Sequence, residues 1–228
     1  MEIDKVVDVL GLPKVLVEGA QSFLNRLLGP AVDETGLLLA DKIRFRRLRN
    51  QVKIAAKAQE LLVEAGLEPK PAPLQTIVPL LEKASLEEEP SIQTMWATLL
   101  ANAAASDARA GIQRLAVEIL AQLSPREALI LRHVYEAYLK KEAEWQADPK
   151  HAREDGPPAE FAFFRPRDLH RVAEVDTRDG DLLLDNLLRL GVLRFEVPEI
   201  ELGQNSYPEF VQLTELGLAV LDECMEGP

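Results

Sequence analysis

The stretch Leu187-Leu-Arg-Leu-Gly-Val-Leu-Arg-Phe-Glu-Val197 decides the fold, because it changes from a helical to a strand pattern in one short passage. The leucines up to Leu190 continue the apolar face of a helix, and Gly191 is a natural residue at which that helix ends. Residues 192–197 then alternate apolar and polar side chains, as a half-buried strand does. This passage therefore predicts a helix followed by the first strand of a β-hairpin.

The segments on either side complete a distinctive order. Ser124-Pro-Arg-Glu127 combines a capping serine, a proline suited to the first helical position and a glutamate that can reach back, so it predicts a helix start. We expect that helix to run to about residue 141. The segments predicted after it are a charged, proline-containing exposed loop at about 142–160, a strand over 161–164, helices over 167–175 and 178–190, a return strand over 210–213 and a last helix capped by Thr214.

Helix, strand, two helices, a two-stranded wing and a final helix is the order of a winged-helix domain, which we predict over residues 124–228. Such a fold does not fix a function. Its third helix carries Asp176, Asp179, Asp181 and Asp185 against Arg178 and Arg189, and carboxylates that face phosphates weaken nucleic-acid binding. A protein-binding or structural role is therefore favoured. The alternative is a nucleic-acid-binding regulator that relies on Arg165, Arg167 and Arg171.

The first half of the chain is predicted to be helical throughout, which makes the fold class mainly α with two domains, 1–123 and 124–228. A long helix is expected at about 33–65, ended by Gly66, and residues 67–73 hold three prolines and form a connector. Ser85-Leu-Glu-Glu88 has the form of a capping box for the helix that follows. The other helices of this N-terminal multi-helix region are expected within 4–28, 74–83, 91–105 and 107–123.

Composition and charge narrow the function classes. The 228 residues are 47% hydrophobic and 28% charged, with a net charge of −12, so the chain as a whole repels nucleic acid and anionic lipid. Residues 1–123 carry 14 basic and 16 acidic residues, and residues 124–228 carry 12 and 22, so polyanion contacts are expected in the first half. Cys224 is the only cysteine, and neither a signal peptide nor a transmembrane segment is expected. We expect a cytoplasmic protein, with a peripheral position at the inner membrane left open.

Seven cations gather in the long helix, within sixteen residues that hold no acid. They are Lys42, Arg44, Arg46, Arg47, Arg49, Lys53 and Lys57. At 100° per residue, Lys42, Arg46, Arg49, Lys53 and Lys57 fall within an arc of about 80°, beside an apolar stripe. One interpretation is a surface that docks on the phosphates of lipid headgroups or nucleic acid. The other is that these cations are solvated, or pair with carboxylates elsewhere in this acidic chain.

The residues give no sign of catalysis. His133, His151 and His170 have no histidine or cysteine partner at zinc-ligand spacing, and the chain holds no glycine-rich phosphate loop and no nucleophile elbow. The acidic run 176–181 does not fit a calcium loop and is expected to interact with a helix N-terminus instead. We therefore expect a protein that is not an enzyme, without a cofactor or a metal.

Several segments together resemble the Abi-alpha family of bacterial abortive-infection proteins. Among them are Met95-Trp-Ala-Thr-Leu-Leu-Ala-Asn102, Leu120-Ala-Gln-Leu-Ser-Pro125 and Leu213-Thr-Glu-Leu-Gly217, and the others lie in 27–47, 78–88 and 187–191. The resemblance implies a role in defence against phage, through arrest or death of the infected cell, and it brings no catalytic residues. We thus hypothesise a non-enzymatic defence protein that binds a protein partner, an anionic membrane surface or nucleic acid. A structural homo-oligomer, built on the N-terminal helices, is a further alternative.

Overall fold

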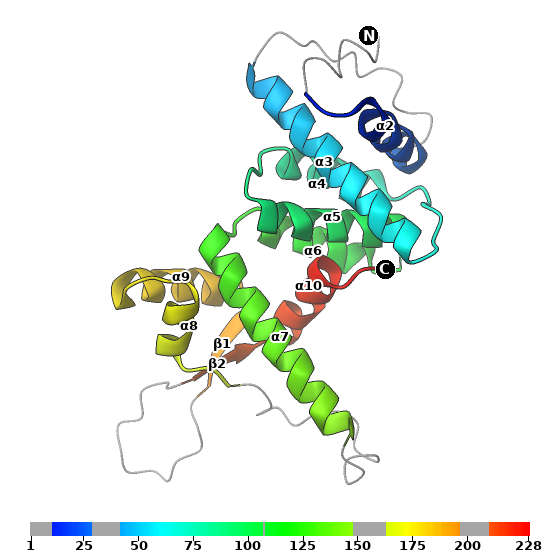
Figure 1. The fold of residues 1–228 in the computed structure, drawn as a ribbon. Helices are drawn as coiled ribbons and strands as arrows, with labels where there is room; N and C mark the ends of the chain where they lie inside the picture. The colour runs from blue at the N-terminus through cyan, green and yellow to red at the C-terminus, as the bar shows by residue number, and fades with distance from the viewer. Residues whose placement is uncertain (1–10, 29–41, 107, 148–162, 197–209) are drawn as a thin grey trace, which may run out of the picture. The chain divides into compact units, whose positions relative to one another are not determined.

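A computed structural model describes residues 11–28, 42–106, 108–147, 163–196 and 210–228. The chain divides into two compact units, which are described separately: Met1–Gln122 with Asp222–Pro228, and Leu123–Leu221. Across the described ranges, the regular structure consists of nine helices and one two-stranded antiparallel hairpin (Figure 1). The protein is therefore mainly α-helical, as predicted. Within these ranges no helix is long and apolar enough to cross a membrane.

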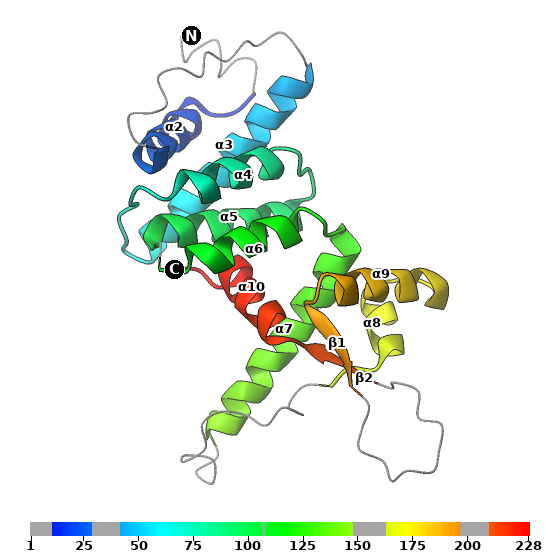
Figure 2. The same cartoon turned by 180° about the vertical axis from the view of Figure 1, so that it is seen from behind.

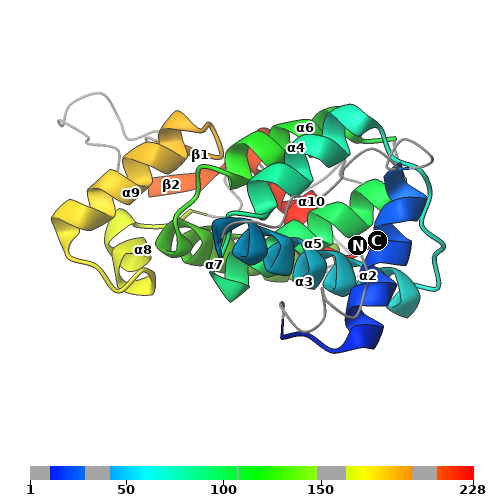
Figure 3. The same cartoon turned by 90° about the horizontal axis from the view of Figure 1, so that it is seen from above.

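The first unit is a group of packed helices. It comprises α2 (Lys14–Leu28), α3 (Lys42–Glu64), α4 (Leu74–Ala84), α5 (Pro90–Ala105), α6 (Ala110–Leu120) and the last turn of α10 (Glu215–Met225). Helix α3 packs on both α2 and α5, and α4, α5 and α6 all contact one another (Figures 2 and 3). The predicted helix at 33–65 is thus observed from Lys42, and its expected first residues, 33–41, lie outside the described ranges.

Helix α5 forms the centre of this unit because it is apolar on almost every side. Its buried residues run without a break from Met95 to Ala101, and Trp96 is 1% exposed. A helix that is hydrophobic all round can only be stable when neighbours cover it. Helices α3, α4 and α6 all contact α5. Large side chains of the unit are buried as well, among them Phe23, Ile54, Leu62, Ile77, Leu80 and Leu120.

Of two helix boundaries predicted in this unit, one is confirmed and the other is wrong. Gly66 adopts φ +68°, and the amide of Leu67 donates to the carbonyl of Leu62, so the predicted glycine cap of α3 is confirmed. The capping box predicted at residues 85–88 is wrong. Helix α5 is preceded by Glu89 without a side-chain cap, and Ser85 instead ends α4, where its hydroxyl donates to the Glu82 carbonyl at 2.6 Å.

The second unit contains the elements predicted around the opening stretch, in the predicted order. They are α7 (Pro125–Ala147), α8 (Pro166–Val172), α9 (Thr177–Arg189), β1 (Leu193–Glu196), β2 (Phe210–Leu213) and the start of α10. Helix α7 is longer than predicted, so residues 142–147 are helical and not part of a loop. Charged residues are found both in exposed helices and in loops. The charges of this segment therefore did not distinguish between the two. The remainder of the predicted loop, 148–160, lies outside the described ranges.

Local capping interactions hold the ends of the helices in the second unit. The hydroxyl of Ser124 accepts from the amide of Glu127 at 3.3 Å, and the Glu127 carboxylate accepts from the Ser124 amide at 2.6 Å, which confirms the predicted reciprocal box. Asp176 caps α9 by accepting from the Asp179 amide at 2.9 Å, and Thr214 caps α10 by accepting from the Gly217 amide at 2.9 Å. Each cap satisfies an amide that the helix leaves unpaired.

The hairpin pairs Leu193 with Leu213 and Glu196 with Phe210, in antiparallel register. Gly191, with φ +72°, makes the turn from α9 into β1, a backbone conformation that glycine adopts without steric cost. Phe164 extends the pairing through an isolated antiparallel bridge with Val211. Of the strand predicted at 161–164, residues 161 and 162 lie outside the described ranges.

Candidate functional site

Four of the seven predicted contact residues form one exposed row along α3, which we call the basic stripe: Arg46, Arg49, Lys53 and Lys57. The row spans about 16 Å at the helical rise of 1.5 Å per residue. The opposite side of the helix is buried in the unit through Val52, Ile54, Ala55, Ala58 and Leu62. The stripe therefore presents its charges outward from a helix whose apolar side is already covered.

The carboxylates of the described residues neutralise this stripe only in part. Arg46 lies 3.6 Å from the Glu88 carboxylate, and Lys57 lies 3.5 Å from that of Glu60, with all four side chains well exposed. Ion pairs this exposed contribute about 0–1 kcal/mol and exchange easily. Neither Arg49 nor Lys53 forms an ion pair with a carboxylate in the part of the chain that the structure describes. Among the described residues, the two central cations of the stripe therefore have no carboxylate partner.

Arg47 differs from the rest of the stripe. Its Nε donates to the hydroxyl of Ser85 at 2.9 Å, and Asn50 and Gln51 from the same helix donate to the carbonyls of Ser85 and Leu81. These three bonds tie α3 to the last turn of α4, where unpaired carbonyls favour donors and cations. Arg47 therefore has a structural partner. The remaining two predicted residues, Lys42 and Arg44, lie in the first turn of α3, and their side chains are outside the described part.

The position of these cations within α3 is not what helix stability favours. The N-terminal end of a helix carries partial positive charge, so acidic side chains stabilise it and basic ones do not. The first turn of α3 holds no acidic residue and includes Lys42 and Arg44, while the last turn holds no basic residue and ends on Glu64. Within Lys42–Glu64, the charges of α3 are thus arranged opposite to those that the helix dipole favours.

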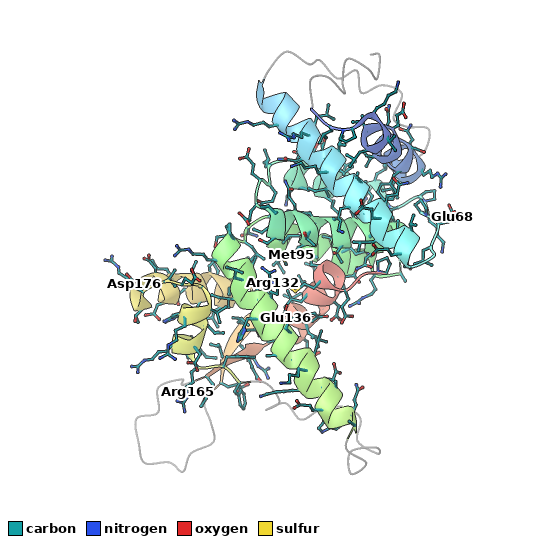
Figure 4. The ribbon with its side chains drawn as sticks, in the orientation of Figure 1. Glu68, Met95, Arg132, Glu136, Arg165 and Asp176 are labelled. Carbon is teal, nitrogen blue, oxygen red and sulfur yellow. The ribbon has the colours of Figure 1, made fainter. Side chains whose placement is uncertain are left out.

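Helix α9 of the second unit has the opposite character. Asp176, Asp179, Asp181 and Asp185 are all exposed, and Leu182 stands among them with 61% of its surface exposed. Figure 4 shows Asp176 at the start of this helix. Arg189 is held by the side-chain oxygen of Asn186 at 2.7 Å. This face offers carboxylates and an apolar contact, a combination that suits a basic protein better than a phosphate backbone.

A buried polar cluster in the first unit escaped the sequence analysis. Glu223, which is 4% exposed, accepts from Arg109 at 3.1 Å and from the amide of Gln113 at 3.1 Å. Asn102 donates to the backbone carbonyls of Glu223 and Glu226 at 3.0 and 2.8 Å. Asn102 belongs to α5, Gln113 to α6 and Glu223 to the last turn of α10. Arg109 directly precedes α6, and Glu226 directly follows α10. Their separation along the chain hid the cluster. The sequence contains one signal of this cluster: Glu223 is a charged residue inside an otherwise apolar helical pattern.

Cys224 and His170 are both buried, and His151 lies outside the described ranges. Burial raises the pKa of the Cys224 thiol far above its ordinary value, and the neighbouring Glu223 carboxylate raises it further, so the thiolate is disfavoured. Cys224 is 1% exposed and therefore belongs to the core. His170 is buried beside Gly180, with Nε2 3.3 Å from an Asp181 oxygen but without hydrogen-bond geometry. Among the described residues, no three His, Cys, Asp or Glu side chains are grouped so that they could hold a metal ion.

Comparison with known proteins gives a single type of match. The family model described as "Abortive infection alpha" matches residues 49–224, which is more than three quarters of the chain and includes most of both units. Neither a curated protein nor a solved structure matches the chain. The match includes the resembling segments at 78–88, 95–102, 120–125, 187–191 and 213–217, whereas the segment 27–47 lies before it. It covers far more than half of the sequence. The chain therefore belongs to the abortive infection alpha family.

Proposed function

We propose that this protein is a non-enzymatic bacterial defence factor of the abortive-infection type, and that the basic stripe on α3 docks it on a phosphate-bearing surface. The family supports the defence role, because abortive infection is the activity for which the family is named. One observation carries the docking role: Arg49 and Lys53 are exposed cations without an ion-pair partner among the described residues of a chain with net charge −12.

The mode of binding follows from what α3 buries. An interfacial helix that inserts into a bilayer needs a free apolar face. Here Val52, Ile54 and Leu62 already pack in the core, so the stripe contacts phosphates by charge and hydrogen bonds only. Lipid headgroups and nucleic acid share this chemistry. In either case affinity falls as the salt concentration rises, and the two sources are separated by experiment.

We further infer that the second unit is a winged helix that contacts a protein and not a nucleic acid. The order of α7, α8, α9, β1, β2 and α10 supports this fold, together with the antiparallel wing. The carboxylates of α9 and the exposed Leu182 support a protein partner with a basic, partly apolar surface. The nucleic-acid-binding alternative depends on Arg165, Arg167 and Arg171, of which Arg171 already lies 3.2 Å from Asp168.

Co-sedimentation with vesicles tests the docking role. Wild-type protein and the double variant Arg49→Glu/Lys53→Glu are compared on vesicles of neutral phosphatidylcholine, and on the same vesicles with anionic phosphatidylglycerol. A parallel fluorescence anisotropy titration uses labelled duplex DNA and RNA. We expect wild type to bind one class of polyanion, and the variant to bind it at least about tenfold more weakly, because two contacts become repulsive.

The matched control is Lys70→Glu/Arg114→Glu. These two cations are also exposed in the first unit, and the substitutions change the net charge by the same amount. The control should bind like wild type if the stripe is the docking surface. Equal loss of binding in both variants would mean that net charge alone governs adsorption. Equal binding by wild type and the stripe variant to vesicles, DNA and RNA would refute the docking role.

A further inference from the structure

A second candidate site lies at the C-terminal ends of two helices in the first unit. A pocket of about 450 Å³ is lined by the last turn of α5, the start of α6 and the segment 222–228, and we call it the C-terminal pocket. Its charged residues are Arg109, Asp222, Glu223 and Glu226. Three carboxylates against one guanidinium leave the pocket with a negative balance. It shares no residue with the basic stripe, so its role is independent of the proposed docking.

Helix dipoles add to this negative balance. The last turns of α5 and α10 both contribute to the wall, through Asn102 and Ala105 on one side and Asp222 and Glu223 on the other. The C-terminal end of a helix carries partial negative charge, which a lysine or arginine in the last turn commonly offsets. Neither helix has a basic residue in its last turn. Two helix ends that favour a cation therefore meet in one pocket.

Gln113 provides a separate indication of a ligand. Its side chain is 2% exposed, and its Nε2 donates to the Ser106 carbonyl at 3.2 Å and to the Glu223 carboxylate at 3.1 Å. Both of these partners line the C-terminal pocket, as Gln113 itself does. Because the two partners accept only, they fix the amide with the nitrogen toward them. The other end of the amide, Oε1, has no donor in the part of the chain that the structure describes.

A buried acceptor without a donor is unfavourable, and a bound donor would remove this cost. Arg109 does not fill this role, since its guanidinium lies against Glu223 at 3.1 Å and Asp222 at 3.7 Å. The group that fits is one that carries positive charge, donates several hydrogen bonds and accepts none. A primary ammonium meets all three conditions. The carboxylates are not arranged as metal ligands among the described residues, which favours hydrogen bonding over coordination.

From this geometry we propose that the C-terminal pocket binds a primary alkylammonium group, which donates to Gln113 Oε1 and is held by the carboxylates of Asp222 and Glu226. A free small amine and the lysine side chain of a peptide both carry this group. A volume of about 450 Å³ admits either one, since it falls within the range of small-ligand sites.

Titration of the full-length, ¹⁵N-labelled protein with n-butylammonium chloride at constant ionic strength tests the proposal. The side-chain amide signal of Gln113 is followed by NMR. We expect a saturable shift for butylammonium and none for tetramethylammonium, which has the same charge but no N–H donor. A shift of equal size with tetramethylammonium, or no saturable shift with butylammonium, would overturn the proposal.

Two variants test the assigned acceptors. Gln113→Leu removes the buried acceptor and should weaken binding about tenfold, as followed through the backbone amides around residue 113. Because that substitution could impair folding, Asp222→Asn/Glu226→Gln provides a second test at more exposed positions, with an expected loss of about fivefold. Arg109→Gln should act in the opposite direction and tighten binding about fivefold, because it removes the resident cation. Unchanged affinity in all three variants would exclude the pocket.

The source of the ammonium is distinguished with a peptide. Acetyl-Gly-Lys-Gly-amide is titrated beside the same peptide carrying acetyl-lysine, which has no ammonium. Binding of the first peptide only would support the site and assign it to a lysine of a protein. Binding of butylammonium without either peptide would support the site for a free amine. Equal binding of both peptides would overturn it, because recognition would then not depend on the ammonium.

Discussion

Gly217, at the start of α10, lies directly against the backbone carbonyl of Val192, and a Cβ added at this glycine would overlap that oxygen. The neighbouring hydroxyl of Thr214 accepts from the Gly217 amide and donates to the Gly191 carbonyl at 2.6 Å. The end of α9, the start of β1 and the start of α10 therefore meet at a point where only glycine fits. Two of the segments that carry the family resemblance, 187–191 and 213–217, are joined here.

Gly217→Ala should therefore destabilise the second unit by about 3 kcal/mol, because a backbone carbonyl cannot move away as the end of a side chain can. Urea unfolding followed by circular dichroism measures the change. Gly111→Ala is the matched control, since a Cβ at this helical glycine meets nothing within 4 Å. The control should be neutral or stabilise by up to about 1 kcal/mol. Similar stabilities for the two variants would contradict the close approach at Val192.

The capping box at the start of α7 makes a second prediction. Ser124→Ala should lower the free energy of unfolding by about 1 kcal/mol, the usual value of such a cap. Glu127→Ala should cost more, about 2–3 kcal/mol, because Glu127 is 3% exposed and its other oxygen accepts from the Asn186 amide. The double variant should lose less than the sum of the two, since the residues share two hydrogen bonds. Strict additivity in the unfolding experiment would argue against a coupled box.

The buried thiol of Cys224 makes the stability depend on pH in the alkaline range. Burial raises the pKa of the folded thiol, whereas the thiol of an unfolded chain ionises near pH 8.5. The folded state thus keeps a proton that the unfolded state releases. The stabilisation from this group is complete below about pH 8, and it declines as the pH rises above 8.5, by about 1.4 kcal/mol per unit.

Cys224→Ala should lack this decline. We expect the loss of unfolding free energy between pH 7.5 and pH 9.5 to be about 1 kcal/mol larger in wild type than in the variant. Urea unfolding of both proteins at the two pH values provides the measurement, and comparison with the variant removes the contributions of lysine and tyrosine. An identical pH dependence in the two proteins would mean that the thiol is not buried as described.

Substitutions in the basic stripe should weaken binding without changing the stability of the fold. Arg49→Gln/Lys53→Gln should change the free energy of unfolding by no more than about 0.5 kcal/mol, because both side chains are exposed. If duplex DNA is the surface bound, the logarithm of the wild-type binding constant should fall with the logarithm of salt with a slope of about −3 to −4. The variant should reduce that slope by about 2. A slope that does not differ between the proteins would place the contacts elsewhere.

The ends of the helices were predictable where their chemistry is local. Gly66, Gly191 and Thr214 end or begin helices as expected, because a cap joins residues within a few positions of one another. The same reasoning failed at Ser85, whose hydroxyl is engaged by the Glu82 carbonyl and by Arg47. A cap motif competes with any tertiary partner that reaches it, and the local sequence does not contain that partner.

The basic stripe and the C-terminal pocket differ in the same respect, since local sequence predicted the first and not the second. The sequence by itself determined that cations gather on one arc of a long helix, because helical periodicity fixes which side chains share a face. Only the tertiary structure decided that Arg47 reaches Ser85 while Arg49 and Lys53 stay exposed, and that residues 222–228 pack with the first unit. Gln113 and Glu223 meet across 110 positions of chain. Such a contact depends on how α5 and α6 pack together with the last turn of α10, and periodicity within one helix carries no information about that packing.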